Sequence, residues 1–135
     1  EAVQAYAHMG GTGVDLQVVG SMDFGGELFG QFSAGFNSNY QQNLRLIGTA
    51  GTFQVGDIFN PHGSAVKGEL VRAEESKNIN FKAENDYKGL LEHFYDVVIS
   101  KESPKFPLSD SVKNMTVIDA IFQSIADGGR SVRLQ

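Results

Sequence analysis

The apolar residues of this chain follow one spacing up to about residue 81 and a different spacing after it. In the first part they alternate with polar residues, as between Val14 and Phe24, which is typical of strands with one buried face. From Tyr87 onward they recur every three or four residues, which indicates helices. A block of strands followed by helices predicts an α+β fold: an open, mostly antiparallel sheet with the helices packed on one face. The other face is then available for oligomerisation.

The strand part of the chain is divided by turn-forming residues. Gly25-Gly26 suits a tight hairpin, because glycine readily adopts positive φ, and Gly48-Thr49-Ala50-Gly51 forms a second glycine-bounded turn. We expect five or six largely antiparallel strands. The candidates for these strands are 14–24, 28–36, 40–47, 52–55, 65–71 and 75–81. The stretch 2–9 is also strand-like, and 131–134 is a short closing strand.

Two helices are predicted downstream. The first opens at Tyr87, where Asn85 or Asp86 can cap it, and the segment 101–104 stops it. The second begins after Pro107. Its start can be capped by Ser109 or Ser111, and its end by a left-handed glycine within Asp127-Gly128-Gly129.

Length and composition narrow the class of protein. A chain of 135 residues has the length of about one domain, and it can bury a hydrophobic core large enough to fold without disulfides or bound metal ions. The absence of cysteine excludes disulfides, thiolate metal sites and a cysteine nucleophile. A net charge of -5 with scattered basic residues argues against nucleic acid as a partner. There is no apolar run of the roughly 20 residues that a membrane span needs, so we expect no membrane partner and a cytoplasmic protein.

The sequence contains no recognisable catalytic, cofactor or metal motif. Gly10-Gly11-Thr12-Gly13 leads into a strand and not a helix, so we interpret it as a turn and not as a phosphate cradle. The three histidines, His8, His62 and His93, are far apart and have no carboxylate at ligand spacing. We therefore predict no catalytic residue, no cofactor-binding residue and no metal ligand in this chain.

Neighbouring carboxylates occur in the predicted connections. Glu74 adjoins Glu75, and Glu84 lies near Asp86, with nothing apolar beside either pair to raise a pKa for acid-base work. We interpret both pairs as solvated surface groups.

The order of several short motifs resembles a known family. The motifs are Phe24-Gly25-Gly26; Leu46-Ile47-Gly48 with Gly51 and Phe53; Tyr87 with Leu91-Glu92 and Phe94; Pro107-Leu108-Ser109; and Asn114, Val117-Ile118-Asp119-Ala120-Ile121-Phe122, Ser124 and Gly128. This order is similar to the C-terminal domain of the glucose-fructose oxidoreductase and inositol dehydrogenase (Gfo/Idh/MocA) family, over nearly the whole chain.

The resemblance implies that two domains of the protein have separate roles. In that family an N-terminal Rossmann domain binds NAD or NADP and carries the catalytic lysine, and the C-terminal domain helps form the sugar or polyol site and makes subunit contacts. Residues 1–135 would then be the substrate-side and oligomerisation domain, without its Rossmann domain, and inactive alone. The fragment would bind no cofactor. Its partners would be its own Rossmann domain, further copies of itself, and a small sugar or polyol.

Two residues are assigned to the substrate site by the same resemblance. Tyr40, at the start of the strand running into Gly48, and Tyr87, opening the first helix, correspond to aromatic residues of the family's cleft. A phenol can both donate to and accept from a sugar hydroxyl. Alternatively, Tyr40 is an edge-strand aromatic and Tyr87 a core-facing helix residue.

Two functions therefore follow from the sequence. The first is a domain of an NAD(P)-dependent oxidoreductase that transfers hydride from a secondary alcohol of a sugar or cyclic polyol to nicotinamide. The alternative is a stand-alone, non-catalytic binding or scaffold domain that dimerises through its open sheet.

Overall fold

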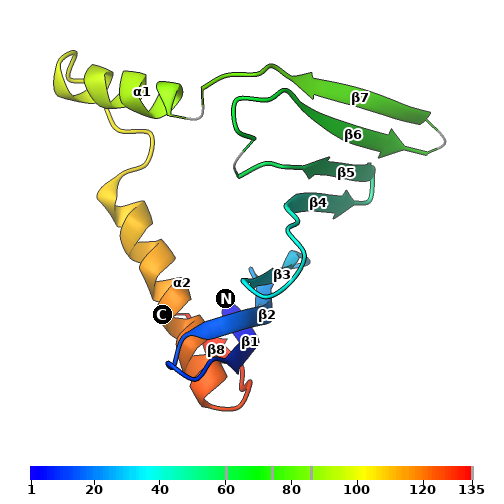
Figure 1. Ribbon diagram of the computed structural model, residues 1–135, viewed down its shortest axis with the longest axis vertical. Helices are drawn as coiled ribbons and strands as arrows, with labels where there is room; N and C mark the ends of the chain where they lie inside the picture. Colours follow the sequence, from blue (N-terminus) through cyan, green and yellow to red (C-terminus); the bar gives the residue numbers. More distant parts are fainter. Residues whose placement is uncertain (60, 74, 86, 135) are drawn as a thin grey trace. The chain divides into compact units, whose positions relative to one another are not determined.

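The computed structural model describes residues 1–59, 61–73, 75–85 and 87–134, and it has the predicted α+β class with two open antiparallel sheets. The chain divides into two units, one formed by residues 1–38 with 105–135 and the other by 39–104. The elements in the described part of the chain, drawn in Figure 1, are β1 (Ala2–Met9), β2 (Asp15–Asp23), β3 (Phe29–Gly35), β4 (Asn43–Gly48), β5 (Gly51–Gly56), β6 (Val66–Arg72), β7 (Glu75–Phe81), α1 (Lys88–Val98), α2 (Leu108–Ala126) and β8 (Val132–Arg133).

The strands form two four-stranded sheets, whereas the sequence pattern led us to expect a single sheet. The first unit has the order β3-β2-β1-β8, and the second has the order β4-β5-β6-β7. All neighbouring strands are antiparallel. Alternation of apolar and polar residues shows which face of a strand is buried, but it does not show which strand lies beside it. The division into two sheets therefore cannot be recognised from the two-residue repeat of the sequence.

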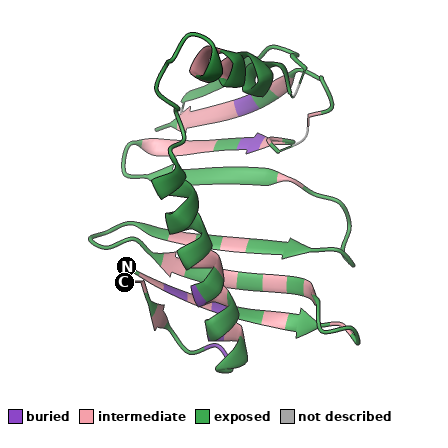
Figure 2. Ribbon diagram, turned by 90° about the vertical axis from the view of Figure 1, so that its left-hand side faces the viewer, coloured by how far each residue is buried: buried purple, intermediate pink, exposed green. Residues whose placement is uncertain are grey.

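In the first unit, α2 packs on one face of the sheet, against β1 and β8. Val3 and Ala5 of β1 are buried there, together with Ala120 and Ser124 of α2 (Figure 2). Small residues at these positions let the helix lie close to the sheet. The core of this unit therefore lies between β1 and the C-terminal half of α2.

The end of α2 follows the predicted left-handed glycine cap. Gly128 and Gly129 have φ of 68° and 87°. The N–H of Gly129 donates to the carbonyl of Ser124 at 2.8 Å, and the N–H of Gly128 donates to that of Ile125 at 3.2 Å. This pair of bonds is a Schellman motif, which satisfies the last carbonyls of the helix.

The start of α2 differs from the prediction. Pro107 occupies the N-cap position with ψ of 160°, and no side chain caps the helix. Ser109 and Ser111 lie inside the first turns, so neither is the cap. The helix begins at Leu108, directly after the extended Pro107, so both serines come too late in the chain to cap it. Asp110 in the first turn lies favourably at the positive end of the helix dipole.

The second unit is a meander of four strands followed by α1. One sheet face is polar and the other apolar, as period-two alternation predicts. In α1 none of the residues is buried, although its apolar stripe was expected to lie on a core. Asn85 lies just before α1, and its Oδ1 accepts a hydrogen bond at 3.0 Å from the N–H of Tyr87, which is the N-cap residue of the helix. The other candidate cap, Asp86, lies outside the described residues.

Neither helix of the described chain combines the length and apolar character that crossing a membrane requires.

Candidate functional site

Tyr40 lies in the segment before β4 and not on a strand, because β4 begins at Asn43. Its side chain is 67% exposed. The phenol oxygen accepts a hydrogen bond from Nε2 of Gln42. The prediction that the strand starts at Tyr40 is wrong by three residues.

Tyr87 is the N-cap residue of α1 and is 70% exposed. It is therefore not the core-facing helix residue of the alternative interpretation. Its carbonyl accepts from the N–H of Leu91 at 3.0 Å, so its backbone is fixed at the first turn of the helix while its ring faces solvent. The structure presents both tyrosines on the surface of the second unit.

Gln42 connects Tyr40 to the loop that follows β5. Its backbone carbonyl accepts from the N–H of Asp57 at 3.0 Å, which adds one rung to the β4–β5 ladder. Its side-chain Oε1 accepts from the N–H of Phe59, also at 3.0 Å. The loop returns towards Gln42 because Asp57 adopts φ of 48°, a left-handed conformation that aspartate tolerates better than most residues. Sequence reasoning missed Gln42, since a glutamine beside a strand carries no signal of its own.

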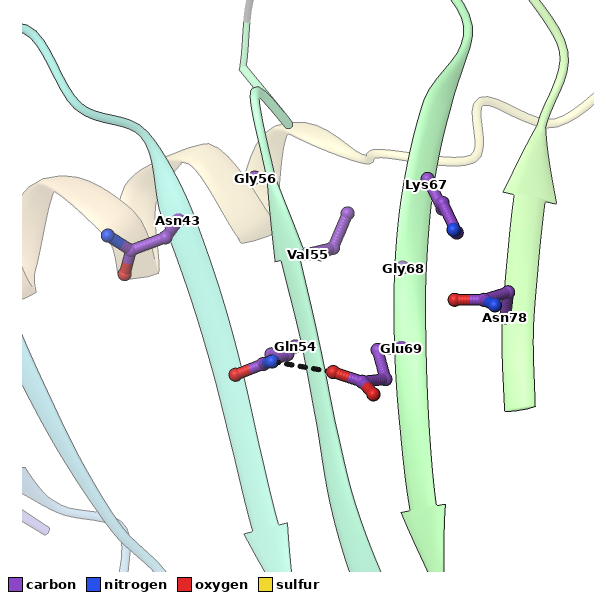
Figure 3. Close-up of a pocket in the computed structure, with 8 residues that line it drawn as sticks. All are labelled: Asn43, Gln54, Val55, Gly56, Lys67, Gly68, Glu69 and Asn78. Carbon is purple, nitrogen blue, oxygen red and sulfur yellow. Dashed lines mark hydrogen bonds between the residues drawn. The ribbon is translucent and has the colours of Figure 1, made fainter. Parts of the chain in front are cut away.

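The polar face of the second sheet is hollowed at its centre. The hollow has a volume of about 480 Å³. In Figure 3 the side chains of Gln54 and Glu69 point toward one another from β5 and β6, and Nε2 of Gln54 donates to Oε2 of Glu69 at 2.9 Å. The lining residues are Asn43, Gln54, Val55, Gly56, Lys67, Gly68, Glu69 and Asn78.

Glu69 is the titratable centre of this hollow. Its Oε1 accepts from the hydroxyl of Ser76 at 2.6 Å. This bond and then the bond from Gln54 hold the pKa of Glu69 below its ordinary value of 4.5, against an opposing effect of burial. The nearby charge of Lys67 lowers the pKa by the least of these effects. A carboxylate held ionised, with both oxygens accepting hydrogen bonds, suits binding of hydroxyl or amide donors better than proton transfer.

A second hollow, of about 430 Å³, lies on the apolar side of the same sheet. Leu44, Phe53 and Val55 form much of its floor, and residues of the loops after β5 and β7 border it. Neither Tyr40 nor Tyr87 is among the residues that line either hollow. The two predicted site residues therefore line neither of these two hollows.

The remaining sequence candidates have structural roles or lie on the surface. Gly10–Gly13 is the predicted turn: the N–H of Gly10 donates to the carbonyl of Val14 at 2.8 Å, and Gly13 has φ of 81°. His62 occupies a turn in which the N–H of Ser64 donates to the carbonyl of Pro61 at 2.9 Å. Of the paired carboxylates, Glu74 and Asp86 lie outside the described residues. In the described part of the chain, no three His, Asp or Glu side chains are grouped to hold a metal ion.

The glycine turn at 10–13 lacks the geometry that binds a dinucleotide. The glycine turn at 10–13 joins the antiparallel strands β1 and β2, so it presents no helix N-terminus to a pyrophosphate. We find no other glycine-rich strand-to-helix connection in the described chain.

This chain is similar to one part of several longer oxidoreductases. No protein-family model matches the sequence. The chain is 27% identical over 124 residues to D-xylose 1-dehydrogenase (NADP(+)) 2 of Haloferax volcanii, which covers 90% of this chain and 38% of that protein. The chain thus spans well under half the length of this curated relative.

Solved structures share the fold. An aldose-aldose oxidoreductase from Caulobacter crescentus, complexed with glycerol, superposes with a TM-score of 0.85 at 17% identity, over 98% of this chain and 41% of that one. A 3-ketoreductase from Actinomadura kijaniata, in complex with NADP and TDP-benzene, gives 0.83 at 19% identity, over 93% of this chain and 39% of that one. The resemblance to the C-terminal domain of the Gfo/Idh/MocA family is confirmed at the level of the fold.

Proposed function

We propose that this chain is the substrate-side and oligomerisation domain of an NAD(P)-dependent oxidoreductase that acts on a sugar or cyclic polyol. The observation that carries the proposal is the alignment of 90% of the chain with 38% of a D-xylose dehydrogenase. The complete enzyme would need a nucleotide-binding domain, because the glycine turn at 10–13 joins two strands and offers no helix N-terminus to the cofactor's pyrophosphate. We also place the enzyme in the cytoplasm.

The surface of α1 supports the need for a covering partner. Leu90, Leu91 and Phe94 are 66%, 62% and 65% exposed and lie on one face of the helix. Large exposed apolar patches are uncommon on monomeric soluble proteins and usually mark an interface. The proposed occupant of this face is the protein's own Rossmann domain.

Tyr40 and Tyr87 remain the proposed substrate contacts. Both phenols are exposed, as a residue that meets a ligand from outside must be. Each offers a hydroxyl on a rigid ring to a sugar oxygen at little cost in side-chain entropy. In this proposal the chain contributes binding and orientation, and it contributes no catalytic residue.

The polar sheet face is proposed as the surface for self-association. It presents amides, a lysine and a carboxylate that can pair with the same groups of a second copy. Light scattering of residues 1–135 should give a dimer or larger. A strictly monomeric species at high protein concentration contradicts this part of the proposal and also the alternative of a scaffold that dimerises through its sheet.

The activity is tested on the protein encoded by the complete reading frame, beside residues 1–135 alone. Both are assayed for reduction of NAD⁺ or NADP⁺ with D-xylose, D-glucose and myo-inositol. We expect turnover only by the complete protein, and calorimetry should detect no binding of NAD(H) or NADP(H) by residues 1–135. Micromolar affinity of residues 1–135 for either dinucleotide would contradict the assignment of the cofactor site to another domain. No turnover by the complete protein with any sugar or polyol favours the non-catalytic scaffold.

A further inference from the structure

Three hydrogen bonds make Gln42 the link between a surface tyrosine and a returning loop. The backbone carbonyl of Gln42 accepts from Asp57, its Oε1 accepts from the N–H of Phe59, and its Nε2 donates to the phenol oxygen of Tyr40. All of these residues belong to the second unit. A single side chain thus holds the loop with one end of its amide and the phenol with the other end.

The orientation of the Gln42 amide is determined by its backbone partner. A backbone N–H can only donate, so the atom of the amide that faces Phe59 must be the oxygen. The NH₂ group is then the end that faces Tyr40. The loop therefore decides which end of the amide meets the phenol.

This orientation also determines the polarity of the phenol. The phenol oxygen must accept from the NH₂ group of Gln42, so its own hydrogen is directed away from Gln42. Since the Tyr40 side chain is 67% exposed, the outward hydrogen is available to a ligand. A ligand group in this position must accept a hydrogen bond, as a sugar hydroxyl or ring oxygen can.

We infer that Gln42 is a positioning residue that holds the phenol of Tyr40 as a hydrogen-bond donor to an oxygen of the sugar or polyol. The inference rests on the proposed function, because it assumes that Tyr40 contacts the substrate. It adds that the contact has one direction, and that the loop at Phe59 enforces this direction through the amide.

Gln42→Glu separates the orientation of the phenol from the attachment of the loop. A glutamate can still accept from the N–H of Phe59, so the loop stays attached. Its second oxygen can only accept, so the phenol must donate inward and loses its outward hydrogen. Gln41→Glu is the matched control, since it adds the same charge at the neighbouring residue. Tyr40→Phe removes the phenol altogether.

The experiment measures the affinity of residues 1–135 for D-xylose by calorimetry in every variant, and it follows the Tyr40 ¹³Cζ resonance, labelled at the tyrosine ring, during the same titration of the chains that keep Tyr40. In the wild type, xylose should shift this resonance, and Gln42→Glu and Tyr40→Phe should each weaken binding by about 2- to 10-fold, the range for one hydrogen bond. The double variant Gln42→Glu/Tyr40→Phe should bind xylose no more weakly than either single variant does. Gln41→Glu should bind as the wild type does. Without sugar, Tyr40→Phe should shift the side-chain amide resonances of Gln42 and leave those of Gln41 in place.

Two results overturn the inference in distinguishable ways. If xylose binds and Tyr40→Phe weakens it, but Gln42→Glu matches the wild type, Gln42 has no positioning role while the proposed function stands. If xylose shifts no Tyr40 resonance in the wild-type chain, the sugar contact at Tyr40 itself is wrong, and the role of Gln42 falls with it.

Discussion

The hydroxyl of Ser124, in α2, accepts a hydrogen bond from the backbone N–H of Ala5, in β1, at 2.9 Å, and both residues are fully buried. β8 pairs with β1 only at Ala2 and Val3, so it ends before Ala5. The same hydroxyl donates to the carbonyl of Arg130 at 2.7 Å. Ser124 therefore supplies the partner that a longer β8 would have given to this strand edge.

Ser124→Ala should destabilise the first unit by about 1–3 kcal/mol, because it leaves a buried N–H without a partner. Chemical unfolding followed by circular dichroism measures the loss, and hydrogen exchange of the Ala5 amide locates it. Ser109→Ala, at an exposed position in the first turn of the same helix, should stay within about 0.5 kcal/mol of the wild type. Unchanged exchange at Ala5 in Ser124→Ala contradicts this role of the hydroxyl.

Gly129→Ala should destabilise the first unit more than Gly128→Ala. Both glycines have positive φ, which costs an alanine about 1–2 kcal/mol. A Cβ on Gly129 would also overlap the ring of Tyr6, whereas one on Gly128 meets nothing within 4 Å. Thermal unfolding of the two variants compares the costs. Removing the ring with Tyr6→Ala should abolish the difference between them, and a difference that persists without the ring points to another cause.

The pKa of Glu69 should move back toward 4.5 in Ser76→Ala, because the hydroxyl of Ser76 makes the largest contribution to lowering it. A group whose pKa is lower in the folded state stabilises that state above its unfolded pKa. The contribution of Glu69 is therefore present above about pH 4.5 and lost as the pH falls through the folded value. NMR titration of the Glu69 ¹³Cδ measures the shift, with Ser64→Ala as a variant expected to leave it unchanged. An identical titration in Ser76→Ala contradicts the assigned cause.

Ala73→Gly should stabilise the β6–β7 hairpin by about 1 kcal/mol, because Ala73 has φ of 51° and glycine adopts this conformation without the steric cost. Ala50→Gly is the matched control in the β4–β5 hairpin, where the alanine is not among the residues with positive φ. Its thermal midpoint should fall slightly or stay constant, while that of Ala73→Gly rises. A lower midpoint for Ala73→Gly contradicts this expectation. It would show that glycine stabilises the unfolded chain, through added conformational entropy, by more than it relieves strain in the folded state.

Local features of the fold were predictable because they depend on residues close together in the sequence. The stretch 14–24 becomes β2 at 15–23, and Gly25-Gly26 adopts φ of 84° and 63° in the turn that follows it. The glycine cap of α2 is likewise encoded within six residues. Features that depend on distant residues were not predictable. The division between residues 38 and 39 separates two sheets although both sides show the same alternation.

The candidate site was predictable only in part for the same reason. An exposed tyrosine can be picked out by resemblance, and both tyrosines are on the surface. Tyr40 is bonded by Gln42, two residues away, but the bond that orients the Gln42 amide comes from Phe59, 17 residues beyond Gln42, and no spacing rule connects these two residues. Similarly, the apolar stripe of α1 predicts a face to be covered but does not say whether a sheet of the same chain or another domain covers it.

The pairing of β1 with β8 also sets an order of folding. The N–H of Leu134 donates to the carbonyl of Glu1 at 3.1 Å, and the 66 residues from 39 to 104 are inserted between the two parts of the first unit. During synthesis the second unit can fold as soon as it leaves the ribosome, since its strands pair with their sequence neighbours. The first unit must wait with the edge of β1 unpaired until α2 and β8 have been made. During this interval the unpaired edge of β1 is a site at which one chain can pair with another and aggregate.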